Sequence, residues 1–237
     1  MIIIFAIIMI SLNNSFKLIL IRHGISKWNA DNVYTGWYNI GLTQTGLQKS
    51  ADLGIILNTL NLRPRVIFTS QQKRAIDTSI AIRGTLTDPN IPMIKHWRLN
   101  ERHYGMLTGL DKTDYPFESK FYEMPPKITR KLDDPILNKI PSYDSGCYFS
   151  KIKYGESLDN VHNRLIPYFY DQIIPFNMDM IIVSHKNTLK TLVKHIENIS
   201  DEEDDCIDIH NSLPIIYDVI PNDTKTKKIF IKNKLFQ

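Results

Sequence analysis

Two short apolar runs in this chain end directly in a histidine, and this repeated pattern constrains the fold more than any other feature. Residues 16–21 (FKLILI) lead into Arg22 and His23, and residues 179–184 (DMIIVS) lead into His185. Apolar runs of this length are typical of buried strands in a parallel sheet. Ligands bind beyond the carboxyl ends of such strands, where the winding of the sheet reverses. The pattern therefore predicts that His23 and His185 lie side by side, although they are far apart in the sequence.

The rest of the apolar pattern alternates between strands and helices. Further strands are predicted over residues 65–69 and 213–220, and helices over residues 43–60, 71–82, 156–173 and 186–197. This alternation predicts an α/β fold, a three-layer sandwich in which helices flank a mainly parallel central sheet. Residues 110–152 are rich in Pro, Tyr, Asp and Lys and have no clear period. We expect them to form an irregular lid insertion within a single domain over residues 16–237.

The charge and cysteine content exclude several classes of partner. The net charge of +4 comes from 29 basic and 25 acidic residues that are dispersed along the chain, so no nucleic-acid partner is expected. Such a balance suits an enzyme whose substrate is a small anion. Cys147 and Cys206 form no CxxC motif, which argues against a metal site or a disulfide framework.

The first ten residues (MIIIFAIIMI) are strongly apolar. A membrane span needs about 20 apolar residues, and a secretory signal needs a basic start and a small-residue cleavage site. This run has neither the length nor those flanks. Residues 1–15 are therefore interpreted as an N-terminal extension, with a targeting role as the less favoured alternative, and the protein is expected in the cytoplasm without a membrane partner.

The residues around His23 suit attack on phosphorus. Imidazole can attack a phosphoryl group and leave again near neutral pH, and the reaction otherwise needs cations and close backbone donors. Arg22 is adjacent, and Gly24 would let the backbone approach a phosphate. Arg74 follows the strand over 65–69 near a helix start, where anions are favoured. The alternative for Arg74 is an ordinary solvated helix residue.

Glu101, in the run RLNERHYG, is the best candidate for a proton donor and acceptor. Its alternative is a salt bridge with Arg98 or Arg102, which flank it. In another motif, Gly155-Glu156-Ser157 lies at the start of a predicted helix. It is expected to cap that helix, with contact between the Glu156 carboxylate and an arginine of the site as the alternative.

Six stretches of the chain, in this order, match one known family. They are LIRHGISKWN (20–29), YTGWYNIGLTQTG (34–46), TSQQKRAIDT (69–78), WRLNERHYGMLTGLDK (97–112), GESLDNVHNRLIP (155–167) and SHKNTLKTLVKHIENIS (184–200). On these motifs the chain resembles the cofactor-dependent phosphoglycerate mutases of the histidine phosphatase superfamily. Arg-His-Gly alone marks only the superfamily, whereas TGW, RLNERHYG, LTGL-x-K and LVKH together are typical of the mutase branch.

The resemblance implies interconversion of 2- and 3-phosphoglycerate, small phosphorylated three-carbon acids, with 2,3-bisphosphoglycerate as the priming phosphoryl donor and no metal. It implies that His23 carries the phosphoryl group, Glu101 transfers the proton and His185 stabilises the phosphoryl group in transfer. It also implies a homodimer or homotetramer. Substrate contacts are implied for Arg22, Gly24, Ser26, Asn29, Thr35, Gly36, Arg74, Arg102, His103, Tyr104, Lys112, Ser119, Lys120, Lys186 and Asn187.

The chain also departs from the family pattern. Ile25 stands where the family usually has Glu, Lys186 where it has Gly, and Ser119-Lys120 where it has an arginine pair. The chain ends at IFIKNKLFQ, soon after the last predicted strand, without the usual tail, and a missing cover would let water reach phosphohistidine. Two alternatives to a mutase therefore stay open. One is a phosphatase on the same scaffold, and the other is a degenerate paralogue that binds phosphorylated ligands without turnover.

Overall fold

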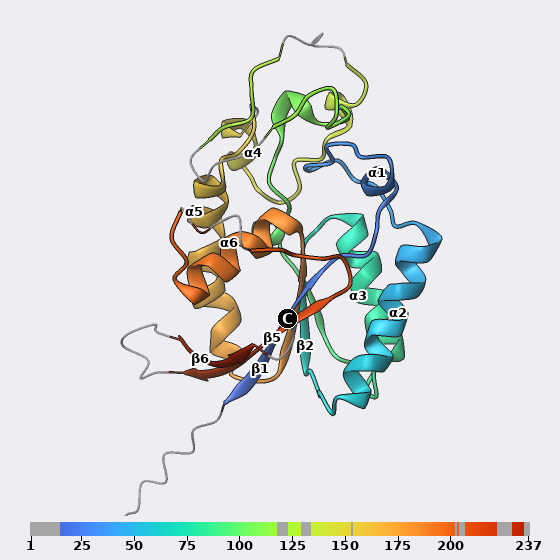
Figure 1. Cartoon of the computed structure of the whole chain (residues 1–237), viewed down its shortest axis with the longest axis vertical. Helices are drawn as coiled ribbons and strands as arrows, with labels where there is room; N and C mark the ends of the chain where they lie inside the picture. The colour runs from blue at the N-terminus through green and yellow to red at the C-terminus, as the bar shows by residue number, and fades with distance from the viewer. Residues whose placement is uncertain are drawn as a thin grey trace, which may run out of the picture.

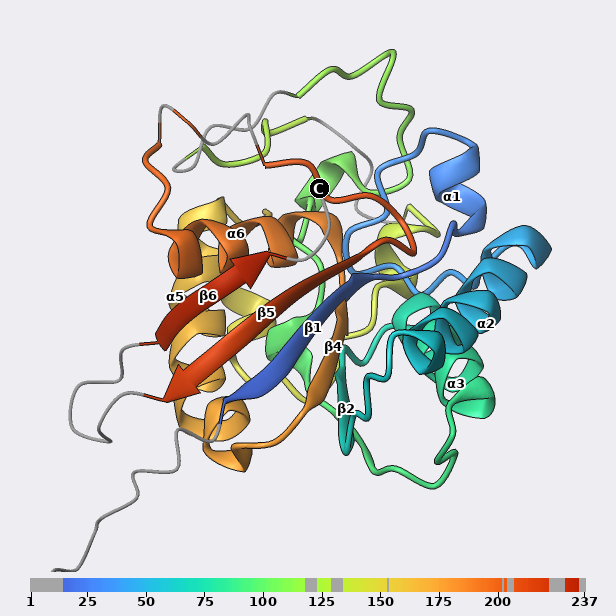
Figure 2. The same cartoon turned by 60° about the horizontal axis from the view of Figure 1, so that its bottom comes forward.

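The computed structural model describes residues 15–117, 123–128, 134–152, 154–201, 203, 207–221 and 229–234. Its described strands form one sheet in the order β3-β2-β4-β1-β5-β6. Figure 2 shows the part of this order from β2 to β6. Neighbours from β3 to β1 are parallel, whereas β5 runs antiparallel to β1 and to β6. The predicted, mainly parallel sheet is thus confirmed. The strands are β1 (Phe16–Arg22), β2 (Val66–Thr69), β3 (Met93–Lys95), β4 (Met180–Ser184), β5 (Pro214–Pro221) and β6 (Ile229–Lys234).

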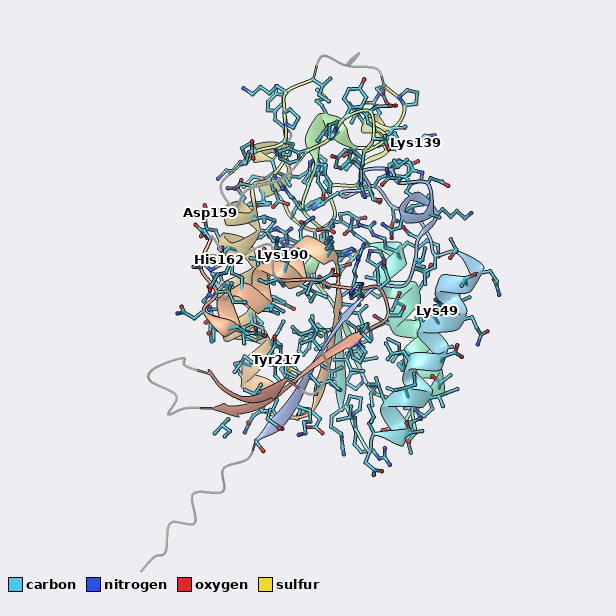
Figure 3. All side chains as sticks on the ribbon, in the orientation of Figure 1. Lys49, Lys139, Asp159, His162, Lys190 and Tyr217 are labelled. Carbon is cyan, nitrogen blue, oxygen red and sulfur yellow. The ribbon has the colours of Figure 1, made fainter. Side chains whose placement is uncertain are left out.

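Helices cover both faces of this sheet, as the sequence predicted (Figure 1). One face carries α2 (Gln44–Thr59) and α3 (Lys73–Thr85), and the other carries α5 (Leu158–Tyr168) and α6 (Lys186–Glu197). Charged side chains such as Lys49 on α2 lie on the outer faces of the helices, whereas Tyr217 of β5 is buried (Figure 3). The result is the expected three-layer sandwich.

Successive side chains of the central strand β1 point to opposite faces of the sheet and pack in two separate clusters of the core. Leu18 and Leu20 of β1 pack in the cluster under α5 and α6, whereas Ile19 and Ile21 pack in the cluster under α2 and α3. All four side chains are at most 1% exposed, so a slip of register by one residue would exchange both faces. The strand ends are therefore strongly fixed in place.

Several elements differ from the sequence prediction. The short edge strand β3, the strand β6 and the four-residue helix α1 (Lys27–Ala30) were not predicted. The helix predicted over 156–173 is α-helical only to Tyr168 and continues as a π-helical turn over Phe169–Ile173. Pro167 lies just before this change and has no backbone N–H to donate within the helix.

The predicted lid insertion lies above the sheet in Figure 1. Its described residues contain no β-strand, and their regular structure is a single turn at Leu137–Lys139 and the short helix α4 (Tyr148–Lys151). Residues 1–14, Ser119 and Lys120 lie outside the described residues. Among the described helices, none is both long enough and apolar enough to cross a membrane.

Candidate active site

His23 and His185 lie side by side at the carboxyl edge of the sheet. Arg22 pairs with Ser184 across the parallel strands β1 and β4, so the residues that follow them emerge at the same level. The two imidazole centroids are 4.9 Å apart, and both side chains are buried. The juxtaposition predicted from the two strand ends is confirmed.

The hydrogen bonds of His23 determine its tautomer. Its Nδ1 lies 2.7 Å from the carbonyl oxygen of Gly24, which can only accept, so Nδ1 carries the ring hydrogen. Nε2 is left with its lone pair and accepts a hydrogen bond from Nε of Arg74 at 3.2 Å. Burial, reinforced by the charges of Arg74 and Arg22, holds the pKa of His23 well below its ordinary value. His23 is therefore a neutral imidazole whose nucleophilic nitrogen faces a guanidinium.

His185 lies behind His23 with one ring nitrogen bonded. Its Nε2 lies 2.8 Å from the hydroxyl of Ser70, which also accepts from the backbone N–H of Gln72 at 3.2 Å. When the Ser70 hydroxyl donates to Nε2, Nδ1 of His185 carries the ring hydrogen, and Nδ1 has no hydrogen-bond partner among the described residues. An unpaired buried donor beside the nucleophile can serve an incoming phosphoryl oxygen.

Arg74 is placed by the first turn of α3, as predicted. Its side chain is 1% exposed and donates to the carbonyls of Gly36 at 2.9 Å and Tyr38 at 3.1 Å, in addition to His23. Burial lowers the pKa of Arg74 to about 10, opposed by the charge of Glu101, so the group stays cationic at neutral pH. The solvated alternative is excluded because the guanidinium is buried.

Gln72, which the sequence analysis did not identify, links the backbone at Glu101 to the backbone at Gly36. Its Oε1 accepts from the backbone N–H of Glu101 at 2.8 Å, and its Nε2 donates to the carbonyl of Gly36 at 2.7 Å. An uncharged amide carries no catalytic signal in a sequence. The one sequence feature that could have pointed to Gln72 is its position two residues before the predicted Arg74.

Glu101 is 7% exposed and accepts a hydrogen bond from the backbone N–H of Arg102 at 2.7 Å through Oε1. Within the described residues it forms no ion pair with Arg98 or Arg102. The salt-bridge alternative is therefore wrong for the described structure. The carboxylate faces the same cavity as His23.

This cavity has a volume of about 360 Å³ and a strong excess of positive charge. Four cationic side chains line it and one carboxylate opposes them, while His23 is neutral. The lining residues predicted from the sequence are Arg22, His23, Asn29, Thr35, Gly36, Arg74, Glu101, Tyr104, Lys112, Lys186 and Asn187. Those not predicted are Tyr34, Pro116 and Phe117.

Lys186, one of the departures from the family pattern, is the exposed first residue of α6. Its backbone is not among the positive-φ residues of the described chain, so no glycine is required there. Lys112 is half-buried, and burial together with the charge of Arg22 lowers its pKa. Asn187 donates to the hydroxyl of Tyr104 at 2.8 Å. Ile25, the other described departure, does not line the cavity.

Gly24 and Ser26 were predicted to contact substrate, but the structure places both outside the cavity lining. A Cβ on Gly24 would lie 2.6 Å from the carbonyl oxygen of Gly46, so this glycine is needed where the loop after β1 runs past α2. Ser26 caps α1, and its hydroxyl donates to Oδ1 of Asn29 at 2.8 Å. Ser26 therefore orients a residue that does line the cavity.

Arg102 and His103 also point elsewhere. Arg102 donates to the carbonyls of Glu156 at 2.5 Å and Glu123 at 2.6 Å, and its guanidinium lies 4.8 Å from the ring centroid of Phe117. His103 packs against Trp37, 5.6 Å between ring centroids, and lines a second cavity of about 370 Å³. Neither side chain lines the cavity that holds His23.

The predicted cap at Glu156 and Ser157 is more specific than expected. Ser157 caps α5, as predicted, by accepting from the N–H of Asn160 at 3.1 Å. Glu156 contacts an arginine, but the partner is the buried Arg164 of α5. No group of three or more His, Cys, Asp or Glu side chains in the described parts of the chain is arranged to hold a metal ion.

Comparison with known proteins places this geometry in one family. The profile of the Histidine phosphatase superfamily (branch 1) matches residues 18–230. A 2,3-bisphosphoglycerate-dependent phosphoglycerate mutase of Mycobacterium leprae is 38% identical over 218 residues, 87% of each chain. One of Streptomyces avermitilis is 36% identical over 222 residues, 86% of this chain and 85% of its own. In structure, a mycobacterial glucosyl-3-phosphoglycerate phosphatase aligns with a TM-score of 0.67 at 16% identity, over 92% of this chain and 98% of its own, which shows the shared fold.

Proposed function

We propose that this chain, which belongs to the histidine phosphatase superfamily, is a 2,3-bisphosphoglycerate-dependent phosphoglycerate mutase. One observation carries the proposal: a neutral histidine nucleophile opens onto a cavity in which four cations face one carboxylate. A phosphoglycerate carries both a phosphate and a carboxylate, so its charge complements that excess. Two relatives with this activity in their names are 36% and 38% identical over most of the chain.

In the proposed reaction, the lone pair on Nε2 of His23 attacks phosphorus, a nitrogen–phosphorus bond forms and the bond from phosphorus to the ester oxygen breaks. Glu101, as the carboxylic acid, gives its proton to the departing oxygen. In the reverse direction, a hydroxyl of bound phosphoglycerate attacks phosphohistidine and gives its proton to the Glu101 carboxylate. Transfer to one hydroxyl and return from the other exchanges the 2- and 3-positions.

The cations have separate tasks in this proposal. Arg74 already lies on Nε2 of His23, so its planar guanidinium would bind the phosphoryl oxygens during transfer. The Nδ1 hydrogen of His185 would donate to the same group. Arg22, Lys112 and Lys186 would hold the remaining charge of the substrate.

The same residues would also bind the priming donor. Four cationic side chains provide more positive charge than one phosphate group requires, so a second phosphate group can be bound as well. Arg22, Arg74, Lys112 and Lys186 would hold 2,3-bisphosphoglycerate, which would supply the first phosphoryl group to His23. The proposed reaction belongs to glycolysis and gluconeogenesis, and we propose a cytoplasmic homodimer or homotetramer.

A coupled assay from 3-phosphoglycerate to 2-phosphoglycerate, with and without 2,3-bisphosphoglycerate, tests the proposal. Isomer formation stimulated by the bisphosphate supports a mutase. Release of inorganic phosphate without isomer would instead identify a phosphatase, and neither product would leave a binding protein. In parallel, an acid-labile label should appear on the wild-type protein and be lost in His23→Ala. Appreciable mutase activity in that variant would exclude His23 as the nucleophile.

A further inference from the structure

Residues 140–152, here called the docked segment, form hydrogen bonds with residues that also form hydrogen bonds with the loop carrying Glu101. That loop, residues 98–103, is called the glutamate loop. Tyr143 of the docked segment donates to the carbonyl of Trp37 at 3.2 Å, and the indole Nε1 of Trp37 donates to the carbonyl of Glu101 at 2.6 Å. Phe149, Ile152 and Tyr143 also pack on Trp37. The two segments therefore share a buried support.

A buried ion pair forms a second connection between the docked segment and the glutamate loop. Nε of Arg164 lies 2.8 Å from Oε1 of Glu156, and the two side chains are 1% and 0% exposed. A buried ion pair loses much of its Coulombic gain to desolvation, so it is not expected for stability alone. It persists where further hydrogen bonds satisfy both groups. The partners of this pair show what it holds.

Both members of the pair grip the glutamate loop. Arg164 donates to the carbonyls of Arg98 at 2.6 Å, Asn100 at 2.9 Å and Glu101 at 3.0 Å. Glu156 accepts from the backbone N–H of His103 at 2.8 Å. The main chain on either side of the Glu101 carboxylate is thus fixed by one ion pair.

The docked segment reaches this pair through one hydroxyl. Tyr148, in α4, donates to Oε1 of Glu156 at 2.7 Å, the same oxygen that binds Arg164. Its ring packs against Trp97, 4.9 Å between ring centroids. Displacing the docked segment would remove this donor from the pair that fixes the glutamate loop.

We propose that Glu156 and Arg164 are positioning residues for Glu101, and that the Tyr148 hydroxyl makes their alignment depend on the seating of the docked segment. A general acid must be held within a fraction of an ångström of its productive place, and Glu101 obtains that placement through its backbone. The inference rests on the proposed function in one respect, that Glu101 is the proton donor to the leaving oxygen.

The test uses the dependence of phosphoryl transfer on the leaving group. An alkyl ester such as 2,3-bisphosphoglycerate needs a proton on its departing oxygen, whereas the nitrophenolate of p-nitrophenyl phosphate leaves without one. Tyr148→Phe keeps the ring and its packing on Trp97 and removes only the hydroxyl. It should slow single-turnover phosphorylation of His23 by 2,3-bisphosphoglycerate about tenfold, the effect of one hydrogen bond to a charged group. Turnover of p-nitrophenyl phosphate should change less than about twofold.

Two further variants calibrate this comparison. Glu101→Gln defines the selective loss expected when the general acid itself is removed, about a hundredfold or more on the alkyl ester. Tyr170→Phe removes a comparable hydrogen bond, between the Tyr170 hydroxyl and Nε2 of His195 at 3.2 Å, and should leave both rates unchanged.

Equal losses on both esters in Tyr148→Phe, or no loss on either, would overturn the positioning role. A selective loss that Tyr170→Phe does not reproduce supports it. The comparison needs only phosphoryl transfer to His23. If the wild-type protein is phosphorylated but forms no isomer, the mutase proposal fails while the positioning role is still tested.

Discussion

Nε of Arg74 donates a hydrogen bond to Nε2 of His23 at 3.2 Å, so the guanidinium lies on the lone pair that would attack phosphorus in the proposed reaction. Burial is the main cause of the low pKa of His23, and the charge of Arg74 adds to it, because a cation opposes a second positive charge at Nε2. The same guanidinium is where the oxygens of a phosphoryl group on Nε2 would arrive. One arginine therefore both maintains the nucleophile and would receive the charge of the group transferred.

Arg74→Lys tests that double role. Lysine keeps the charge but cannot donate from a planar fork to His23 and to the carbonyls of Gly36 and Tyr38 together. We expect phosphorylation of His23 to slow by about a hundredfold, comparable to losing a preorganised donor in other active sites. Quench-flow labelling measures the rate. Lys73→Ala is the control. It removes the exposed cation directly before Arg74 in α3 and should change the rate less than about twofold. A similar loss in both variants would contradict the specific role of Arg74.

Gly24→Ala should destabilise the protein and disturb His23. The added Cβ would lie 2.6 Å from the carbonyl oxygen of Gly46 and 2.7 Å from Oγ of Ser50, so the loop after β1 must move away from α2. We expect the free energy of unfolding in urea to fall by about 1–3 kcal/mol. Labelling of His23 should fall as well, because the carbonyl of Gly24 holds its Nδ1.

Gly84→Ala is the matched control for this substitution. Gly84 is in α3, and a Cβ there would meet no atom within 4 Å. Alanine should raise the free energy of unfolding by about 0.5–1 kcal/mol, through helix propensity. If Gly24→Ala proved as stable as the wild-type protein, the close approach of β1 and α2 would not constrain that position.

The sequence identified the reactive groups better than the groups that hold them. His23, His185 and Arg74 follow apolar strands, and parallel strands bring their carboxyl ends to one edge, so local patterns were sufficient to place them together. Glu101 needed the family resemblance, because nothing local separates a catalytic carboxylate from one paired with its neighbours.

The supporting contacts depend on tertiary structure that no local pattern encodes. Arg164 donates to the carbonyls of Arg98, Asn100 and Glu101, which lie 63 to 66 positions earlier in the sequence. Arg102 matched a family motif, but its side chain donates to the carbonyl of Glu123 and does not line the cavity. The strand β3 has only three residues, too few to show a period.

Lys186 should contribute to binding at a cost in stability. As the first residue of α6 it places a positive charge at the positive end of the helix dipole, which costs about 0.3–1 kcal/mol. Lys186→Ala should therefore raise the free energy of unfolding by about that amount, and should raise KM for 3-phosphoglycerate about two- to fivefold through loss of an exposed charge contact. Both effects should shrink at high salt.

Lys190 provides the control for Lys186. It lies one turn further along α6 (Figure 3) and is not among the residues that line the cavity. Lys190→Ala should leave KM unchanged. A KM unchanged in Lys186→Ala as well would show that the lysine at the family's glycine position does not touch substrate, and a lower KM would show that it obstructs the site.

His103 should make the protein less stable in mild acid. Burial lowers its pKa to about 4, against the opposing charge of Glu156 and together with that of Arg164, whereas the unfolded side chain titrates at about 6.5. Between these two values the unfolded chain binds more protons than the folded one. The free energy of unfolding therefore falls as the pH falls from about 6.5 to about 4, and the 2.5-unit difference corresponds to about 3 kcal/mol from this one group.

Urea unfolding at a series of pH values measures this effect. His103→Asn keeps an oxygen that can accept from the N–H of Gly105, as Nδ1 of His103 does at 3.0 Å, but it does not titrate. It should be less stable at pH 7 because it leaves space beside Trp37, yet its stability should fall less between pH 6.5 and 4 than that of the wild-type protein. Parallel curves for His103→Asn and the wild-type protein would mean that His103 takes up its proton without unfolding, and so that its surroundings in the folded chain accommodate the charge.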